Sequence, residues 1–396
     1  DDGPQPRGKQ VKNPHGIWYT PVTGIWQTVW VESVPNIHIT RTKHTPQLDA
    51  GKLTFESTVQ GAMSGEQIKV IVKDGTKIIK EQIGDVNATF EIDVPNLEAW
   101  SPMNPKLYDL DIQLTHKGKV IDQAKSYFAM RKISMEKDKS GIQRMMLNNE
   151  FVFQYGPLDQ GWWPDGLHTA PSDEALKYDI IKTKEMGFNM IRKHIKVEPA
   201  RWYRHCDSIG ILVWQDMPSG DLGGNGWDMQ PGKLSGNNRE KVRTTESESY
   251  FRKEWKAIME SMHNYPSIVV WVPFNEAWGQ FKTKEITEWT MGFDPSRLVN
   301  SASGGNFMNT GHIMDIHNYP DAAMPDPDLF GENQTLVLGE FGGLGLPVDG
   351  HTWQEKDNWG YQSFKNVEEV TKRYNQLIHN LTKLIPMGLS AAVYTQ

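Results

Sequence analysis

Several features that mark particular classes of protein are missing from this chain of 396 residues. A single cysteine, Cys206, excludes an intrachain disulfide and a metal cluster held by thiolates. No apolar run approaches the roughly 18 residues of a membrane-spanning helix. The net charge is mildly acidic, at −7, and no block of basic residues is present. We therefore expect neither a membrane nor a nucleic acid as a partner.

The first residues carry neither an initiator methionine nor the pattern of a signal peptide. We therefore interpret the chain as an excised or processed part of a longer protein. A signal peptide upstream of Asp1 is compatible with this interpretation. The composition also leaves the oligomeric state open, and a homo-oligomer is compatible with it.

Residues 37–131 contain short segments in which apolar and polar residues alternate. The clearest are Lys52–Val59, Gln67–Val72 and Tyr108–Leu114, and turn signals such as Asp74-Gly75 separate the segments. About seven such strands in roughly ninety residues, without a helical period, are typical of an immunoglobulin-like β-sandwich. We expect this domain to be a spacer without chemistry of its own.

Residues 1–36 form a shorter unit before this sandwich. Residues 24–32 alternate in the same way and predict strand structure. Because so few strands cannot close a core of their own, we interpret them as the end of another sandwich domain whose earlier strands lie outside the chain.

After Lys132 the predicted strands alternate with longer helical segments, which is typical of a parallel sheet. Eight strands within residues 132–396 favour a (β/α)₈ TIM barrel, and no Gly-rich phosphate-binding turn supports a doubly wound sheet instead. The strands are predicted at 151–155, 189–194, 211–215, 268–274, 298–301, 313–317, 336–339 and 390–394, and the helices at 172–186, 198–209, 239–264, 282–291 and 367–384.

The stretch Ser267–Gly279 contains the first candidate catalytic residue. Its first six residues, mostly β-branched or aromatic and bounded by prolines, predict a strand that is buried on both faces. Asn275 and Glu276 follow this strand directly. Barrel enzymes build their active sites at the C-terminal ends of strands, which makes Glu276 a candidate. A helix cap or a surface ion pair is the alternative for a single carboxylate.

A second acid, Glu340, ends the predicted seventh strand. Strands four and seven face each other across the mouth of an eight-stranded barrel, so their two carboxyl groups can flank one bond. Glycoside hydrolysis requires such a pair, and a separation of about 5 Å favours double displacement. Glu276 would then protonate the leaving oxygen, and Glu340 would attack the anomeric carbon.

The other strand ends and the first loop supply candidate substrate-binding residues. Arg192 and Tyr319 would keep Glu340 ionised through a positive charge and a hydrogen bond. The alternatives are a structural ion pair for Arg192 and simple packing for Tyr319. The remaining candidates are His194, Asp216, Trp278 and His317 near strand ends, and Trp163 and Asp165 in the first loop, where an indole can stack on a sugar ring.

These motifs resemble glycoside hydrolase family 2, the retaining β-glycosidases that include β-galactosidases, β-glucuronidases and β-mannosidases. Gly24–Glu32 resembles the last strands of the family's N-terminal sugar-binding jelly roll. The sandwich resembles its immunoglobulin-like domain, and residues 132–396 resemble its catalytic barrel. The resemblance covers nearly the whole chain.

The resemblance implies roles for particular residues. Glu276 matches the acid/base, and Asn275 matches the asparagine that binds the sugar 2-hydroxyl. Glu340, within Leu338–Gly342, matches the nucleophile, and Arg192 matches the arginine that supports it. The segment after Arg192 departs from the family pattern, because His194 comes one position early.

The resemblance also implies an activity. We expect an exo-acting, retaining β-glycosidase that removes terminal non-reducing sugars, most similar to β-galactosidases and without a cofactor or a required metal. The first alternative is a carbohydrate-binding or scaffold protein without catalysis. β-Glucuronidase or β-mannosidase specificity is the other. Secretion or a periplasmic location is favoured by the resemblance alone.

Overall fold

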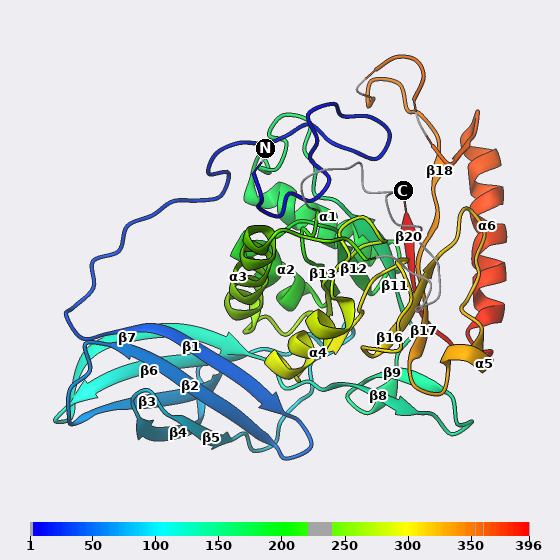
Figure 1. Cartoon of the computed structure of the whole chain (residues 1–396). Coiled ribbons are helices and arrows are strands. Elements are labelled where there is room, and N and C mark those ends of the chain that lie inside the picture. Colours follow the sequence, from blue (N-terminus) through cyan, green and yellow to red (C-terminus); the bar gives the residue numbers. More distant parts are fainter. Residues whose placement is uncertain (1–2, 221–239, 353, 359, 396) are drawn as a thin grey trace.

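The computed structural model describes residues 3–220, 240–352, 354–358 and 360–395. Figure 1 shows a β-sandwich beside a barrel, with the N-terminal segment lying over one end of the barrel. The predicted combination of a sandwich and a TIM barrel is confirmed. We retain residues 1–36, 37–131 and 132–396 as a proposed division into domains.

The sandwich consists of two antiparallel sheets, with strand orders β1-β2-β5 and β4-β3-β6-β7. Alternation in the sequence explains this packing, since Leu53 and Phe55 of β2 face Ile68 and Val70 of β3 in a shared core. The strands are β1 (His38–Gln47), β2 (Lys52–Gln60), β3 (Glu66–Asp74), β4 (Lys77–Asp85), β5 (Thr89–Asp93), β6 (Tyr108–His116) and β7 (Lys119–Phe128).

The prediction of strand structure at residues 24–32 is wrong. The structure contains no strand between residues 20 and 37, and Ile25, Trp30 and Val31 are exposed. An alternating pattern forms a strand only where a neighbouring strand offers hydrogen bonds, and none pairs with this segment. The segment instead runs as an extended connection from the barrel to the sandwich (Figure 1). The interpretation of residues 1–36 as the remnant of a jelly roll stays a prediction.

Eight parallel strands form the barrel, in the order β15-β14-β13-β12-β11-β20-β17-β16. A bridge between Asn300 and Ile313 and a hydrogen bond from His312 N to Val299 O, 2.9 Å long, connect β15 to β16 and close the ring. The strands are β11 (Gln154–Asp159), β12 (Met190–Lys193), β13 (Leu212–Asp216), β14 (Ile268–Val272), β15 (Leu298–Val299), β16 (Ile313–His317), β17 (Thr335–Gly342) and β20 (Leu389–Thr395).

Strand β14 is buried on both faces, as its sequence predicted. Trp271 packs outward against Trp255 of α3, with ring centroids 5.5 Å apart, whereas Val270 and Val272 join a cluster with residues of the other strands. The helices are α1 (Asp173–Glu185), α2 (Ala200–Ile209), α3 (Thr245–Met262), α4 (Thr283–Phe293), α5 (Pro327–Phe330) and α6 (Val367–Leu384).

The first barrel strand begins later than predicted. Phe151 belongs instead to β10 (Glu150–Phe151), in a small sheet with β8 (Ile133–Lys137) and β9 (Gln143–Leu147), and the barrel strand starts at Gln154. The sequence misleads because β11 contains Gly156 and Pro157, which usually argue against a strand interior. Gly156 is required here, because a Cβ atom would lie 1.7 Å from Met190 O of β12.

Two further short strands, β18 (Leu344–Gly345) and β19 (Gln362–Ser363), pair beyond the end of β17. No helix among the described residues is long and apolar enough to cross a membrane.

Candidate active site

Glu276 follows β14 in an unusual backbone conformation. Its φ of 51° lies in the left-handed region, which disfavours residues with a Cβ atom. Two hydrogen bonds hold the backbone there: Glu276 N donates to Ser303 O over 2.6 Å, and Ser303 N donates to Phe274 O over 3.0 Å. Such locally unfavourable conformations cluster at functional sites, where they fix the direction of a side chain.

Glu340 lies within β17, every residue of which is buried. The pairing of β17 with the neighbouring strand β16 places Glu340 opposite His317. The preceding residue must be small, because a Cβ atom on Gly339 would lie 2.0 Å from Asp315 Oδ1. Gly339 therefore leaves the space that the buried carboxyl group of Asp315 occupies.

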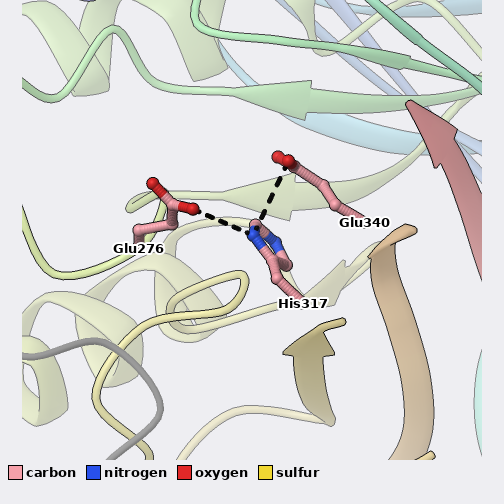
Figure 2. Close-up of side chains that lie close together, drawn as sticks. All are labelled: Glu276, His317 and Glu340. Atoms are coloured by element: carbon pink, nitrogen blue, oxygen red, sulfur yellow. Dashed lines mark hydrogen bonds and ion pairs between the residues drawn. The ribbon is translucent and has the colours of Figure 1, made fainter. Parts of the chain in front are cut away.

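Figure 2 shows the imidazole of His317 between the carboxyl groups of Glu276 and Glu340. Its Nδ1 atom lies 3.2 Å from Glu276 Oε1 and 3.7 Å from Glu340 Oε2. One oxygen from each glutamate and one nitrogen of His317 all lie within 4.8 Å of one another. The two carboxyl groups are therefore close together, which is the short separation typical of double displacement.

Arg192 connects the two strand ends that carry these glutamates. Its Nη1 donates to Glu340 Oε1 over 3.3 Å, and its Nη2 donates to Asn275 Oδ1 over 2.7 Å. Its Nε and Nη2 also form a bidentate pair with Asp216, at 3.1 and 2.9 Å. The guanidinium is completely buried, and the fixed geometry of its donors positions all three side chains at once.

Asp216 and His194 form a second pair beside Arg192. Their closest atoms, His194 Nδ1 and Asp216 Oδ2, lie 2.8 Å apart. Burial and the nearby positive charges of Lys9 and Arg192 hold the pKa of His194 well below its ordinary value. A neutral imidazole that donates from Nδ1 to Asp216 leaves Nε2 as an acceptor. This Nε2 is buried without a partner among the described residues, which suits a substrate hydroxyl.

The charges around Glu340 favour its ionised form. Burial alone would raise the pKa of Glu340, but the positive charges of His317, Arg192 and Lys9 lower it below the ordinary value of a glutamate. Burial would likewise lower the pKa of His317, but the carboxylates of Glu340 and Glu276 outweigh burial and raise it. An ionised Glu340 is the state that a nucleophile needs.

Tyr319 contacts the carboxylate oxygen of Glu340 that Arg192 does not. Its hydroxyl donates a hydrogen bond to Glu340 Oε2 and lies 3.0 Å from Thr395 Oγ1 of β20. Its ring stacks on Tyr361, with centroids 3.9 Å apart. Burial and the charge of Glu340 raise the pKa of Tyr319, so it stays a hydrogen-bond donor.

Trp278 lies two residues after Glu276 and is buried by the N-terminal segment. Trp18 packs edge-on against it, with ring centroids 5.3 Å apart, and Val11 and Ile195 complete the cluster. The indole Nε1 is buried without a partner among the described residues, so this group can donate to a ligand.

Trp163 and Asp165 were predicted to bind substrate, but the structure does not place them next to Glu276 and Glu340. Both lie in a turn closed by paired hydrogen bonds between Trp163 and Leu167. Trp163 packs against the hydrophobic cluster of the barrel, and Asp165 is exposed. Neither contacts the cluster around Arg192 in the described part of the chain, so their predicted substrate contact has no support from this geometry.

Glu276, His317 and Glu340 are also of the right types and spacing to hold a metal ion. The surrounding charges oppose this role. Arg192 Nη1 lies 3.3 Å from Glu340, and the ammonium group of Lys9 acts on both carboxylates. A bound cation would be repelled by both positive groups. The expectation that no metal or cofactor is needed stays a prediction.

Two residues of the candidate site, Ser303 and Lys9, are not among the residues predicted from the sequence. Ser303 follows the fifth barrel strand, and its Oγ lies 2.7 Å from Arg192 Nη1 and 2.9 Å from His317 Nε2. The position of Ser303 shortly after a predicted strand could have identified it as a candidate site residue. Lys9 belongs to the N-terminal segment, and nothing in its local sequence indicates that it lies near a barrel strand end.

Two sequence models of the same family match the chain. The model described as "Glycosyl hydrolases family 2" matches residues 37–131, and the model described as "Glycosyl hydrolases family 2, TIM barrel domain" matches residues 169–338. The chain belongs to glycoside hydrolase family 2. The predicted family is thereby confirmed.

Individual family 2 proteins resemble the chain at low sequence identity. A protein of Formosa agariphila with the provisional name beta-glucuronidase is 25% identical over 383 residues, which cover 93% of this chain and 34% of that protein. A "Beta-galactosidase" of Streptococcus thermophilus is 22% identical over 300 residues, which cover 70% of this chain and 27% of that protein. The chain thus spans about a quarter to a third of the length of these curated relatives.

Solved structures share the fold. The structure titled "beta-D-Glucuronidase for Dictyoglomus thermophilum" superposes with a TM-score of 0.67 at 16% identity, over 91% of this chain and 62% of that one. A galacturonate-bound GH2 beta-galacturonidase from Eisenbergiella tayi gives a TM-score of 0.65 at 17% identity, over 92% of this chain and 65% of that one. At such identities the likeness concerns the fold alone.

Proposed function

We propose that this chain carries the active site of a retaining β-glycosidase that hydrolyses terminal, non-reducing β-linked sugars. The observation that carries the proposal is the pair formed by Glu276, after β14, and Glu340, on β17, whose carboxyl oxygens come within 4.8 Å of each other. This short separation favours a covalent intermediate. Membership of family 2 supports the exo mode of action.

The proposed reaction has two displacements at the anomeric carbon. In the first, Glu340 attacks that carbon, the glycosidic carbon–oxygen bond breaks, and Glu276 gives its proton to the leaving oxygen. In the second, Glu276 takes a proton from water, the water oxygen bonds to the anomeric carbon, and Glu340 leaves as a carboxylate. Arg192 and Tyr319 stabilise that carboxylate before attack and after release.

Two substrate classes are candidates. The resemblance of the sequence predicts a β-galactosidase-like specificity, and proteins with the name beta-galactosidase are among the relatives. The Formosa agariphila relatives have the provisional name beta-glucuronidase, which favours a uronic acid as the second candidate. The non-catalytic alternative has less support, because both glutamates are present with the partners that a retaining mechanism needs.

The test is hydrolysis of nitrophenyl β-galactoside, β-glucuronide and β-mannoside by the full natural chain. We expect turnover of at least one substrate and a loss of about 1,000-fold or more in kcat for Glu340→Gln. Glu288→Gln on α4, where the side chain is exposed, is the matched control and should retain full activity. NMR of the first-formed sugar should show the β-anomer.

Three results would count against this proposal. The absence of turnover on every β-glycoside would exclude the enzyme, unchanged turnover by Glu340→Gln would exclude the nucleophile, and a first-formed α-anomer would exclude retention.

A further inference from the structure

The N-terminal segment, residues 3–20, lies over the end of the barrel toward which β20 points (Figure 1). It contacts the loops that follow several barrel strands. Arg7 N donates to Gly220 O over 3.3 Å, and Gln10 Nε2 lies 3.0 Å from His168 Nε2. The ring of Tyr19 stacks on Trp162 with centroids 4.8 Å apart. The segment therefore forms part of the wall of the candidate site, although it is far from the barrel in sequence.

Tight packing fixes the backbone around Lys9 against the loops of the candidate site. A Cβ atom on Gly8 would lie 2.8 Å from Ile195 Cγ2, and one on Gly220 would lie 2.6 Å from Gly8 O. Lys9 O accepts a hydrogen bond from Tyr19 N over 2.9 Å, and this bond closes the loop between the two residues. The lysine side chain is only 7% exposed.

The surroundings of the Lys9 ammonium group are those of the active site. Its electrostatic neighbours are the two glutamates, Arg192 and Asp216, and it acts in turn on Glu340 and His194. The Lys9 ammonium group nevertheless makes no hydrogen bond and no ion pair with any residue that the structure describes. A mostly buried ammonium group that lies among other charges without a direct partner is available to a ligand, which can supply that partner.

The charges of the site favour an anion as that partner. Asp216 and Glu340 already accept hydrogen bonds from Arg192, and Glu276 must be protonated for the first displacement. Lys9 therefore has no carboxylate of its own when substrate binds, although the charges of Glu340 and Asp216 still act on it from a distance. Burial lowers the pKa of Lys9 although the carboxylates act against this shift, and an anionic ligand would offset the same cost.

We propose that Lys9 is a specificity-determining residue that binds the carboxylate of a terminal uronic acid, so that the site selects acidic over neutral sugars. The inference rests on the proposed β-glycosidase function and narrows its substrate class. The N-terminal segment, rather than a barrel loop, supplies the charged contact.

The test compares substrates that differ only at C6, namely nitrophenyl β-galacturonide with β-galactoside and β-glucuronide with β-glucoside. We expect the full natural chain to prefer the acidic member of at least one pair. Replacement of Lys9 by Met should lower the acidic-to-neutral ratio of kcat/KM about 100-fold, since a site built around a charged contact loses most of its discrimination with that contact. Lys9→Gln serves the same purpose if Lys9→Met fails to fold.

Lys12→Met is the matched control, because Lys12 belongs to the same segment and its side chain is exposed. This variant should keep the parental ratio. A parental preference for the neutral sugars, or an unchanged ratio in Lys9→Met, would overturn the role of Lys9. The absence of turnover on all four substrates would instead overturn the β-glycosidase function on which the inference rests.

Discussion

Arg192 is the residue through which the separate parts of the candidate site are held together. It lies on β12, and its guanidinium reaches side chains from β13, from the end of β14 and from β17. A fourth contact, to Ser303 Oγ at 2.7 Å, links it to the segment after β15. Because these contacts use donors in a rigid planar fork, a lysine cannot make them all.

We therefore predict that Arg192→Lys lowers kcat/KM by about 10- to 100-fold and destabilises the fold by about 1–3 kcal/mol, because buried acceptors lose their donors. Enzyme kinetics and denaturant unfolding measure the two effects.

The matched control is Arg201→Lys on α2, where the ion pair with Asp173 is exposed. Its unfolding free energy should change by less than about 0.5 kcal/mol. Wild-type activity in Arg192→Lys would show that the fork geometry is unimportant.

Strand β17 shows how one element is adapted to carry the proposed nucleophile. The strand is buried along its whole length, and a glycine stands directly before Glu340. The carboxyl group of Asp315 occupies the space that a side chain at Gly339 would need. Asp315 Oδ2 accepts a hydrogen bond from Asn300 Nδ2 over 2.7 Å, so Asp315 cannot easily move aside.

Gly339→Ala is therefore expected to destabilise the protein by about 1–3 kcal/mol through overpacking and to lower kcat by displacing Glu340. Thermal unfolding and steady-state kinetics are the measurements.

Gly292→Ala on α4 is the control, since a Cβ atom there meets nothing within 4 Å. It should be neutral or stabilise the protein by up to about 1 kcal/mol. Equal effects of the two substitutions would contradict the explanation by close packing.

At the scale of the whole molecule, a buried polar cluster joins the sandwich to the barrel. Asp207 of α2 accepts a hydrogen bond from Tyr127 of the sandwich over 2.6 Å and another from Ser267 N over 2.8 Å. Trp100 donates to Asp207 O over 2.8 Å. Arg131 adds hydrogen bonds to the carbonyl groups of Pro266, Ser296 and Ile268, and so anchors the end of the sandwich to β14.

This junction should make stability depend on pH. Burial raises the pKa of Asp207 to about 6, although the hydrogen bonds from Ser267 and Tyr127 oppose the shift. Because a carboxyl group of the unfolded chain titrates near pH ~4, the folded protein binds more protons between these values. The stability that Asp207 contributes is therefore complete below about pH 4 and is lost as the pH rises through about 6.

We predict that Asp207→Asn reduces the fall in unfolding free energy between pH 4 and pH 7 by on the order of 1–3 kcal/mol. Denaturant titrations at both pH values measure it. Asp85→Asn, at an exposed position of β4, should leave the pH dependence unchanged. The same pH dependence in Asp207→Asn and the parent would contradict the assignment.

The order of the domains and the two acids of the site could be predicted without the structure. Buried parallel strands are short apolar runs in the sequence, and the residues just after such a run lie at the mouth of a barrel. Glu276, Glu340, Arg192 and His317 were found in this way. The strand predicted at residues 24–32 failed because alternation says nothing about whether a partner strand is present.

What the sequence by itself determined is therefore local: which segments become strands and helices, and which side chains stand at their ends. The tertiary structure alone decided that Ser303 joins Arg192 to His317 and that Glu276 adopts a left-handed conformation. It also decided that the charge of Lys9 acts on two glutamates that follow it by more than 260 residues. The physical reason is that burial, charge balance and missing hydrogen-bond partners depend on neighbours distant in the chain, and no local pattern contains them.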